Sequence, residues 1–208
     1  MADAATTTIR HDTGERHRRK YADKNPLQRL ALGRFHDEAA AAIREMAPKS
    51  LLDFGCGEAF LAEKLAERGV DLSGYVGVDL RGEAILDAKA RLPNLAFAEA
   101  DIFAWPADGR RFDLVLASQV LEHLVEPRPY LQRLVALCRG KLLLTVPLEP
   151  WFQLINFARG RDLARLGNHP EHVNRWSFES FQSFVSADAA VERAWIVFPF
   201  TFVIARPR

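Results

Sequence analysis

The chain has 208 residues, of which 49% are hydrophobic and 26% are charged, and its formal net charge is +1. This composition argues against wholesale disorder, and the near-zero charge is unlike that of a strongly basic nucleic-acid binder. The two cysteines, Cys56 and Cys138, stand in no paired-Cys motif. A disulfide scaffold or a Cys-rich zinc site is therefore not expected, and free thiols suit a reducing cytoplasm.

A membrane anchor is not expected either. The first residues contain no apolar run of signal-peptide length. The longest apolar stretch, at 194–205, is interrupted by Pro199 and is too short for a bilayer, which takes about 20 residues. We expect a cytoplasmic protein with no membrane insertion.

Two units are predicted along the chain. Residues 1–47 begin as a polar arm rich in arginine and lysine, which is either a solvated segment or a lid over a ligand, and continue as a helix at 27–46. Pro48 ends that helix, because the residue before a proline disfavours helical backbone. Residues 48–208 form the main domain, in which strand-like and helix-like apolar patterns alternate.

The alternation predicts a mostly parallel sheet with helices on both faces. We expect strands at 50–54, 75–79, 95–98, 112–117, 141–146, 191–198 and 201–206, and helices at 58–68, 82–92, 129–139 and 177–186. The last two strands are joined too closely to be parallel and should form a hairpin. Ligands of such sheets bind beyond the carboxyl ends of the strands, so the residues at those ends are the candidates for function.

The first strand runs into a turn that contains Gly55 and Gly57. Glycines let the backbone turn sharply and let a ligand approach it, although such a turn can also be purely structural. The dinucleotide fingerprint requires a third glycine where this chain has Phe60. Asp53 precedes the turn, and a carboxylate there repels a pyrophosphate but attracts a cation. The pattern favours a positively charged ligand, such as one in which an amino-acid ammonium group accompanies a sulfonium.

Acids also follow the next two predicted strands. Asp79 is placed to accept hydrogen bonds from both hydroxyls of a ribose. Asp101 is placed to accept one from an adenine amino group, with Ile102 and Phe103 flanking the ring. Either acid could instead be a solvated turn residue. Four polar residues follow the fourth strand, and some of them should face the crevice: Ser118, Gln119, Glu122 and His123.

Five segments in this order resemble the class I S-adenosylmethionine-dependent methyltransferase family. They are DFGCGEA, VGVDL, ADIF, FDLVLASQVLEHL and KLLLTVP, which together cover about residues 48–147. The predicted hairpin is similar to the last two strands of that family. The chain departs from the family pattern at Ala59, where a third glycine is common. The resemblance implies a Rossmann-like fold whose seven-stranded, mostly parallel sheet ends in an antiparallel hairpin.

The resemblance also implies the cofactor S-adenosylmethionine, with S-adenosylhomocysteine as product. The turn after the first strand would hold the methionine part, the acids after the second and third strands would hold the ribose and adenine, and the end of the fourth strand would lie near the sulfonium. The residues so assigned are Asp53, Gly55, Cys56, Gly57, Asp79, Leu80, Asp101, Ile102, Ser118 and Gln119.

The reaction implied is methyl transfer to a small-molecule acceptor, such as a metabolite or a natural-product intermediate. An in-line displacement needs positioning and a dry site rather than a covalent nucleophile. His123 is the candidate general base, because an unperturbed imidazole titrates near neutrality, although histidine in this family's L-E-H motif often has a structural role.

Residues 148–176 form a long connection that we expect to cap the acceptor pocket. The candidate acceptor-binding residues are Tyr21, Glu149, Trp151, His172 and Trp176. His169 and His172 are separated by Pro170 and match no metal-binding motif, so no metal site is predicted.

Two other functions stay open at this point. A nucleotide-dependent oxidoreductase is disfavoured by Phe60 and Asp53, and a non-catalytic methyltransferase-like partner is disfavoured by the intact acids and glycines. The sequence leaves open the acceptor, the atom that is methylated and the choice between monomer and homodimer. A nucleic-acid acceptor is not expected.

Overall fold

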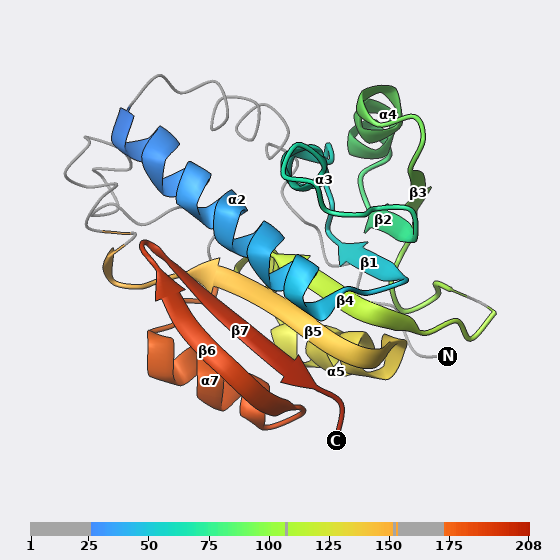
Figure 1. Cartoon of the computed structure of the whole chain (residues 1–208). Coiled ribbons are helices and arrows are strands. Elements are labelled where there is room, and N and C mark those ends of the chain that lie inside the picture. The colour runs from blue at the N-terminus through green and yellow to red at the C-terminus, as the bar shows by residue number, and fades with distance from the viewer. Residues whose placement is uncertain (1–25, 107, 152, 154–172) are drawn as a thin grey trace.

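The computed structural model describes residues 26–106, 108–151, 153 and 173–208, and it shows a central sheet with helices on both faces (Figure 1). The strands are β1 (Leu51–Phe54), β2 (Tyr75–Asp79), β3 (Ala96–Glu99), β4 (Phe112–Ser118), β5 (Cys138–Pro147), β6 (Ala190–Val197) and β7 (Phe200–Arg206). The helices are α2 (Pro26–Met46), α3 (Phe60–Ala66), α4 (Gly82–Arg91), α5 (Pro127–Leu137) and α7 (Phe178–Ser186), with a short 3₁₀ turn, η1 (Leu121–His123).

The seven strands lie in the order β3-β2-β1-β4-β5-β7-β6. Strands β1 to β5 pair in parallel, whereas β7 is antiparallel to both β5 and β6. The expected sheet and its terminal hairpin are therefore confirmed. The chain steps outward from β1 to β3 on one side and continues from β4 on the other, so a crevice opens between the carboxyl ends of β1 and β4, as parallel sheets of this kind require.

Alternating residues of the strands point to opposite faces of the sheet and pack into two separate hydrophobic cores. On β1, Leu51 belongs to the core beneath α2, α3 and α4, and Leu52 belongs to the core beneath α5 and α7. The same alternation separates Leu116 from Val115 on β4. Strands buried on both faces are near-continuously apolar, which is why the sequence shows them as short hydrophobic runs.

Helix α2 crosses the sheet in front of β5 and β7 (Figure 1). Its buried stripe contains Phe35, whose ring lies 4.8 Å from that of Phe200 and 5.0 Å from that of Phe202. Aromatic pairs at these centroid distances are favourable packing geometries. The helix predicted at 27–46 therefore packs against the sheet of the main domain.

Several predicted helix boundaries differ from the structure by one or two residues, and two of these differences have a clear physical cause. The helix expected to run to residue 139 ends at Leu137, because Cys138 begins β5 and pairs with Phe112 of β4. The helix expected from residue 58 begins at Phe60, because Ala59 has a left-handed φ of 60° that no α-helix contains. In both places a tertiary or turn requirement overrides the local helical pattern.

The amino-terminal ends of β1, β4 and β5 are joined through one carboxylate. Asp113 Oδ2 accepts hydrogen bonds from the backbone nitrogens of Lys49 (3.1 Å) and Ser50 (3.0 Å), and Oδ1 accepts one from Arg139 Nε at 2.9 Å. The bond from Arg139, aided by those from Ser50, lowers the pKa of Asp113.

We expect Asp113→Ala to lower the free energy of unfolding by about 1–2 kcal/mol at neutral pH, since several donors lose their acceptor. Because the pKa of Asp113 is lowered by folding, this contribution is present above the ordinary carboxyl pKa and is lost as the pH falls through the folded value. Urea unfolding at pH 7 and pH 3 measures it. Asp108→Ala, at a fully exposed ion pair, is the control and should leave the midpoint nearly unchanged.

Candidate functional site

The turn after β1 requires glycine at two positions. Gly55 and Gly57 have φ values of 71° and 55°, which lie in the left-handed region. A Cβ at Gly55 would lie only 2.6 Å from Cγ2 of Val120. Glycine is therefore required at position 55 both by its backbone conformation and by the packing of Val120 against it.

Asp79, at the end of β2, holds this turn in place. Its Oδ2 accepts a hydrogen bond from the backbone nitrogen of Gly57 at 2.9 Å, and its Oδ1 accepts one from the backbone nitrogen of Arg81 at 2.9 Å. Two residues that lie 22 positions apart in the sequence thus meet at one edge of the sheet. Asp79 therefore lies beside the glycine turn, whereas its predicted contact with a ribose stays a prediction.

Asp53 is an almost completely buried acid, with 2% of its surface exposed. Its Oδ2 accepts a hydrogen bond from the hydroxyl of Tyr75 at 2.8 Å. Burial raises the pKa of Asp53 to about 7; the bond from Tyr75 opposes the rise and the charge of Asp79 adds to it. A cation bound beside Asp53 would favour its ionised form.

The Cys56 thiol lies between the two glycines and is also buried. Burial, together with the charges of Asp53 and Asp79, raises the pKa of Cys56 well above its ordinary value. The thiol therefore stays protonated and lines the turn as a small apolar group rather than as a nucleophile.

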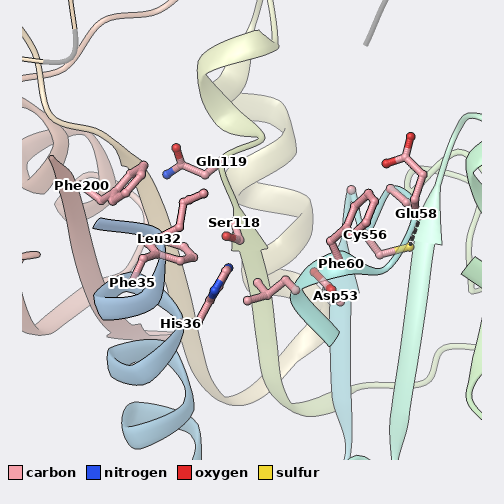
Figure 2. Close-up of a pocket in the computed structure, with 13 residues that line it drawn as sticks. Leu32, Phe35, His36, Asp53, Cys56, Glu58, Phe60, Ser118, Gln119 and Phe200 are labelled. Carbon is pink, nitrogen blue, oxygen red and sulfur yellow. Dashed lines mark hydrogen bonds between the residues drawn. The ribbon is translucent and has the colours of Figure 1, made fainter. Parts of the chain in front are cut away.

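Asp53, Cys56 and the two glycines line a pocket that opens between α2, α3 and the carboxyl ends of β1 and β4 (Figure 2). The pocket encloses about 680 Å³ together with the solvent at its mouth. It brings together several residues that the sequence assigned to the cofactor: Asp53, Gly55, Cys56, Gly57, Ser118 and Gln119. It also contains residues that the sequence interpretation missed: Leu32, Phe35, His36, Glu58, Phe60, Leu61 and Phe200.

His36 is the most informative of the missed residues. It is 4% exposed on the buried stripe of α2, beside Phe35 and in series with Ala39, Ala40 and Ile43. A histidine on an otherwise apolar helical face was the available signal in the sequence. What the sequence could not give was the position of α2 across the pocket.

Thr145 of β5 fixes the end of β4. Its hydroxyl lies 3.1 Å from the Ser118 hydroxyl, and its carbonyl accepts a hydrogen bond from the backbone nitrogen of Gln119 at 2.9 Å. Gln119 has a left-handed φ of 58°, and its side-chain amide donates to Thr145 Oγ1 at 3.4 Å. The chain therefore leaves β4 sharply at the pocket and turns into η1.

The residues assigned to the adenine and ribose lie along the same edge but outside the pocket lining. Ile102 is buried, whereas Asp101 is exposed and its Oδ1 accepts a hydrogen bond from the backbone nitrogen of Phe103 at 3.0 Å. The Phe103 ring lies 4.8 Å from that of Tyr130, and Leu80 is 45% exposed. Their contacts with a cofactor stay predictions.

His123 lies in η1, just past the end of β4. A residue far away in the sequence stabilises η1, because the side-chain amide of Asn174 donates hydrogen bonds to the carbonyls of Leu121 and Leu124. His123 is half-buried and is not among the residues that line the pocket. Its assignment as a base stays a prediction.

The candidate acceptor residues occupy different environments. Glu149 accepts a hydrogen bond from the backbone nitrogen of Gln153 at 3.0 Å, and partial burial raises the pKa of Glu149. Trp151 is 51% exposed, and its ring lies 6.1 Å from that of Phe198.

Trp176 is buried, and its ring packs on Phe181 and Phe184 at 5.3 and 5.2 Å. This places Trp176 in the core beneath α7. The other two candidates, Tyr21 and His172, lie outside the described residues, as does most of the predicted cap at 148–176.

Within the part of the chain that the structure describes, no group of three or more His, Cys, Asp and Glu side chains is arranged to hold a metal ion. Within the same residues, no helix has the length and apolarity that a membrane crossing needs.

A family model described as a methyltransferase domain matches residues 16–188. The chain belongs to this methyltransferase domain family. The expectation that the chain is a methyltransferase is thereby confirmed at the level of the family.

Curated relatives match a limited part of the methyltransferase domain. A trans-aconitate 2-methyltransferase of Methylobacterium radiotolerans is 35% identical over 123 residues, which cover 56% of this chain and 45% of the relative. A ubiquinone biosynthesis O-methyltransferase of Coxiella burnetii is 33% identical over 101 residues, which cover 45% of this chain and 42% of the relative. The matched part thus spans less than half the length of either relative.

Solved structures match the methyltransferase domain over nearly its whole length. The magnesium protoporphyrin IX methyltransferase of Synechocystis PCC 6803, crystallised with S-adenosylhomocysteine, has a TM-score of 0.71 at 18% identity and covers 95% of both chains. The plantazolicin methyltransferase BpumL, also in complex with S-adenosylhomocysteine, has a TM-score of 0.72 at 13% identity, with 96% of this chain and 91% of that chain covered. These likenesses confirm the Rossmann-like methyltransferase fold.

Proposed function

We propose that this methyltransferase domain transfers the methyl group of S-adenosylmethionine to a small-molecule acceptor. The observation that carries the proposal is the left-handed turn at Gly55 and Gly57, held by Asp79 and open to a pocket that contains the buried carboxylate of Asp53. Gly55, Gly57 and the Asp53 carboxylate line one pocket, so backbone groups and an anion face the same space, and these residues fit a ligand that carries an ammonium group.

The cofactor's parts match the chemistry along this edge. Asp53 and the glycine turn would hold the methionine part, Asp79 with Leu80 the ribose, and Asp101 with Ile102 the adenine. Ser118 and Gln119, fixed by Thr145, would lie near the sulfonium. When bound there, S-adenosylmethionine supplies an electrophilic methyl group.

In this proposal the chain positions the cofactor, gives the pocket apolar walls and supplies a proton acceptor. The pocket walls include the apolar side chains of Leu32, Phe35, Phe60 and Phe200, which would pack against the methionine part. Cys56 stays protonated, so a covalent protein nucleophile is not part of the proposed reaction. His123 accepts the proton of a hydroxyl or amine acceptor in this proposal.

The acceptor is a small organic molecule rather than a nucleic acid, in keeping with the names of the curated relatives, which act on trans-aconitate and in ubiquinone biosynthesis. Of the candidate acceptor residues, Glu149 and Trp151 would contact the acceptor in this proposal, whereas Trp176 packs in the core beneath α7. Tyr21 and His172 lie outside the described residues. The two free, buried thiols suit the reducing cytoplasm.

The start of α3 disfavours the alternative function of a nucleotide-dependent oxidoreductase. Phe60 begins that helix where the pyrophosphate of a dinucleotide would approach, and the Arg91 guanidinium lies 4.0 Å from the centre of its ring. The family match likewise favours methyl transfer. A non-catalytic partner would bind S-adenosylhomocysteine without transferring a methyl group.

Calorimetry with S-adenosylhomocysteine and with NAD separates the first two functions, and we expect binding of the former only. Transfer of radiolabelled methyl from S-adenosylmethionine to a panel of carboxylic acids, phenols and amines then tests catalysis. Binding of NAD without S-adenosylhomocysteine would contradict the proposal.

His123→Ala should lower the turnover number by about 10²-fold or more while leaving the affinity for S-adenosylhomocysteine within about twofold, because a general base acts on the acceptor and not on the cofactor. Steady-state kinetics with the acceptor and calorimetry measure the two quantities. Unchanged turnover would remove His123 from the reaction, and an equal loss of cofactor affinity would assign it to the packing of η1.

A further inference from the structure

The amino-acid part of S-adenosylmethionine carries two opposite charges, and the pocket must match both. Asp53 offers an anion to the ammonium group. The carboxylate group needs a cationic or strongly donating partner, because an unpaired charge in a dry site is costly. The turn that surrounds Asp53 is flanked by a second acid, Glu58, which cannot serve that purpose.

His36 is the one described pocket-lining residue whose side chain can carry a positive charge. The imidazole is 4% exposed and lies edge-on to Phe35, with 5.7 Å between ring centres. Figure 2 shows it extending from α2 into the pocket, on the side across from Asp53. The two side chains thus approach the same space from opposite walls.

Two arginines near the glycine turn, Arg81 and Arg91, pair with acceptors of the protein itself. Arg81 donates to Asp79 at 3.3 Å and lies 3.6 Å from Glu58 Oε1. Arg91 donates to the Glu58 carbonyl at 3.0 Å and to Glu63 at 3.2 Å. Neither lines the pocket.

The wall around His36 would strengthen a charged hydrogen bond. Leu32, Phe35 and Phe200 line the same pocket with apolar surface, and an ion pair is worth more where such surface lowers the local dielectric constant. An apolar side chain would serve packing alone better than a histidine on this apolar face. A histidine that faces a zwitterionic ligand has a chemical role, because it can bind the ligand's negative group.

We propose that His36 binds the carboxylate of the amino-acid part of the cofactor, while Asp53 binds its ammonium group. The inference rests on the proposed function, because it concerns the same pocket and the same cofactor. It makes α2 part of the cofactor site, so the helix that precedes the glycine motif closes over the methionine end.

The test compares three ligands by calorimetry: S-adenosylhomocysteine, its decarboxylated analogue, which keeps the ammonium group, and methylthioadenosine, which lacks both charges. We expect the protein to bind S-adenosylhomocysteine at least 10-fold more tightly than the decarboxylated analogue. His36→Gln should weaken S-adenosylhomocysteine about 10- to 100-fold and leave the other two ligands within about twofold. Asp37→Asn, on the exposed side of α2, should change none of the three affinities.

Each failure has a distinct meaning. If His36→Gln weakens all three ligands alike, or none, His36 does not bind the carboxylate and the inference is overturned. If that variant does not fold, equal affinity of the unaltered protein for S-adenosylhomocysteine and the decarboxylated analogue overturns it. Absence of S-adenosylhomocysteine binding by the unaltered protein would instead overturn the proposed function.

Discussion

Asp53→Asn is expected to make the ligand-free protein more stable at pH 8 and to weaken its binding of S-adenosylhomocysteine about 100-fold or more. Both effects have one cause, the placement of a carboxylate in a buried site. Asparagine has nearly the same shape, and its amide oxygen can accept the hydrogen bond from the Tyr75 hydroxyl. The substitution therefore removes the charge while it keeps the packing.

The sign of the stability change follows from the direction of the pKa shift. Folding raises the pKa of Asp53 from 3.8 to about 7, so the folded protein holds a proton that the unfolded chain has already released in this range. Stability is therefore lost as the pH rises from about 4 to about 7. The rise corresponds to roughly 4 kcal/mol at 1.36 kcal/mol per pKa unit, which is the upper bound of the gain at pH 8.

Thermal unfolding of the two proteins between pH 5 and pH 8 measures this effect. We expect the advantage of Asp53→Asn to grow across this range. Tyr75→Phe is the matched control, because it removes the bond that opposes the rise in the pKa of Asp53 and should lower stability at pH 8. An Asp53→Asn protein that is less stable than the unaltered one at pH 8 would contradict the explanation.

The loss of affinity follows from the same carboxylate. A buried, ionised Asp53 is costly without a ligand and is compensated when an ammonium group binds beside it. The stability that the protein forgoes at this position is thus linked to its function. Calorimetry with S-adenosylhomocysteine at pH 8 gives the affinity of each variant.

The strands and the acids at their ends could be predicted because their signals are local. The short apolar runs of β1 and β2, each followed by an acid or a glycine turn, locate the carboxyl edge of the sheet directly. The positions of Asp53 and Asp79 follow from parallel pairing, in which Asp53 lies opposite Gly77. Sequence order and strand pairing together therefore place the pocket residues that follow β1 and β4, but not those contributed by α2, α3 and β7.

What the sequence could not predict depends on contacts between distant segments. His36 and Phe200 lie more than 160 positions apart, and only the packing of α2 across β7 brings them to one pocket. Cys138 matched a helical stripe, but pairing with Phe112 placed it in β5. The hydrogen bond between Asp53 and Tyr75 depends on the register of two strands and has no local signal.

Asp79→Ala should produce the largest loss of cofactor affinity, about 10²- to 10³-fold for S-adenosylhomocysteine. Two contributions combine in this loss. The proposed hydrogen bonds to the ribose hydroxyls disappear, and bonds to a charged acceptor are worth about 1.5–3 kcal/mol each. In addition, the backbone nitrogens of Gly57 and Arg81 lose their shared acceptor, so the glycine turn is no longer held against β2.

The two contributions can be separated with a ligand that lacks both ribose hydroxyls. Asp79→Ala should weaken S-adenosylhomocysteine more than this dideoxy analogue, and the difference measures the ribose contact, whereas the loss common to both ligands measures the turn. Glu83→Ala removes an exposed acid from the first turn of α4 and is the matched control for charge. Equal losses for the two ligands would show that Asp79 holds the turn and does not bind the ribose.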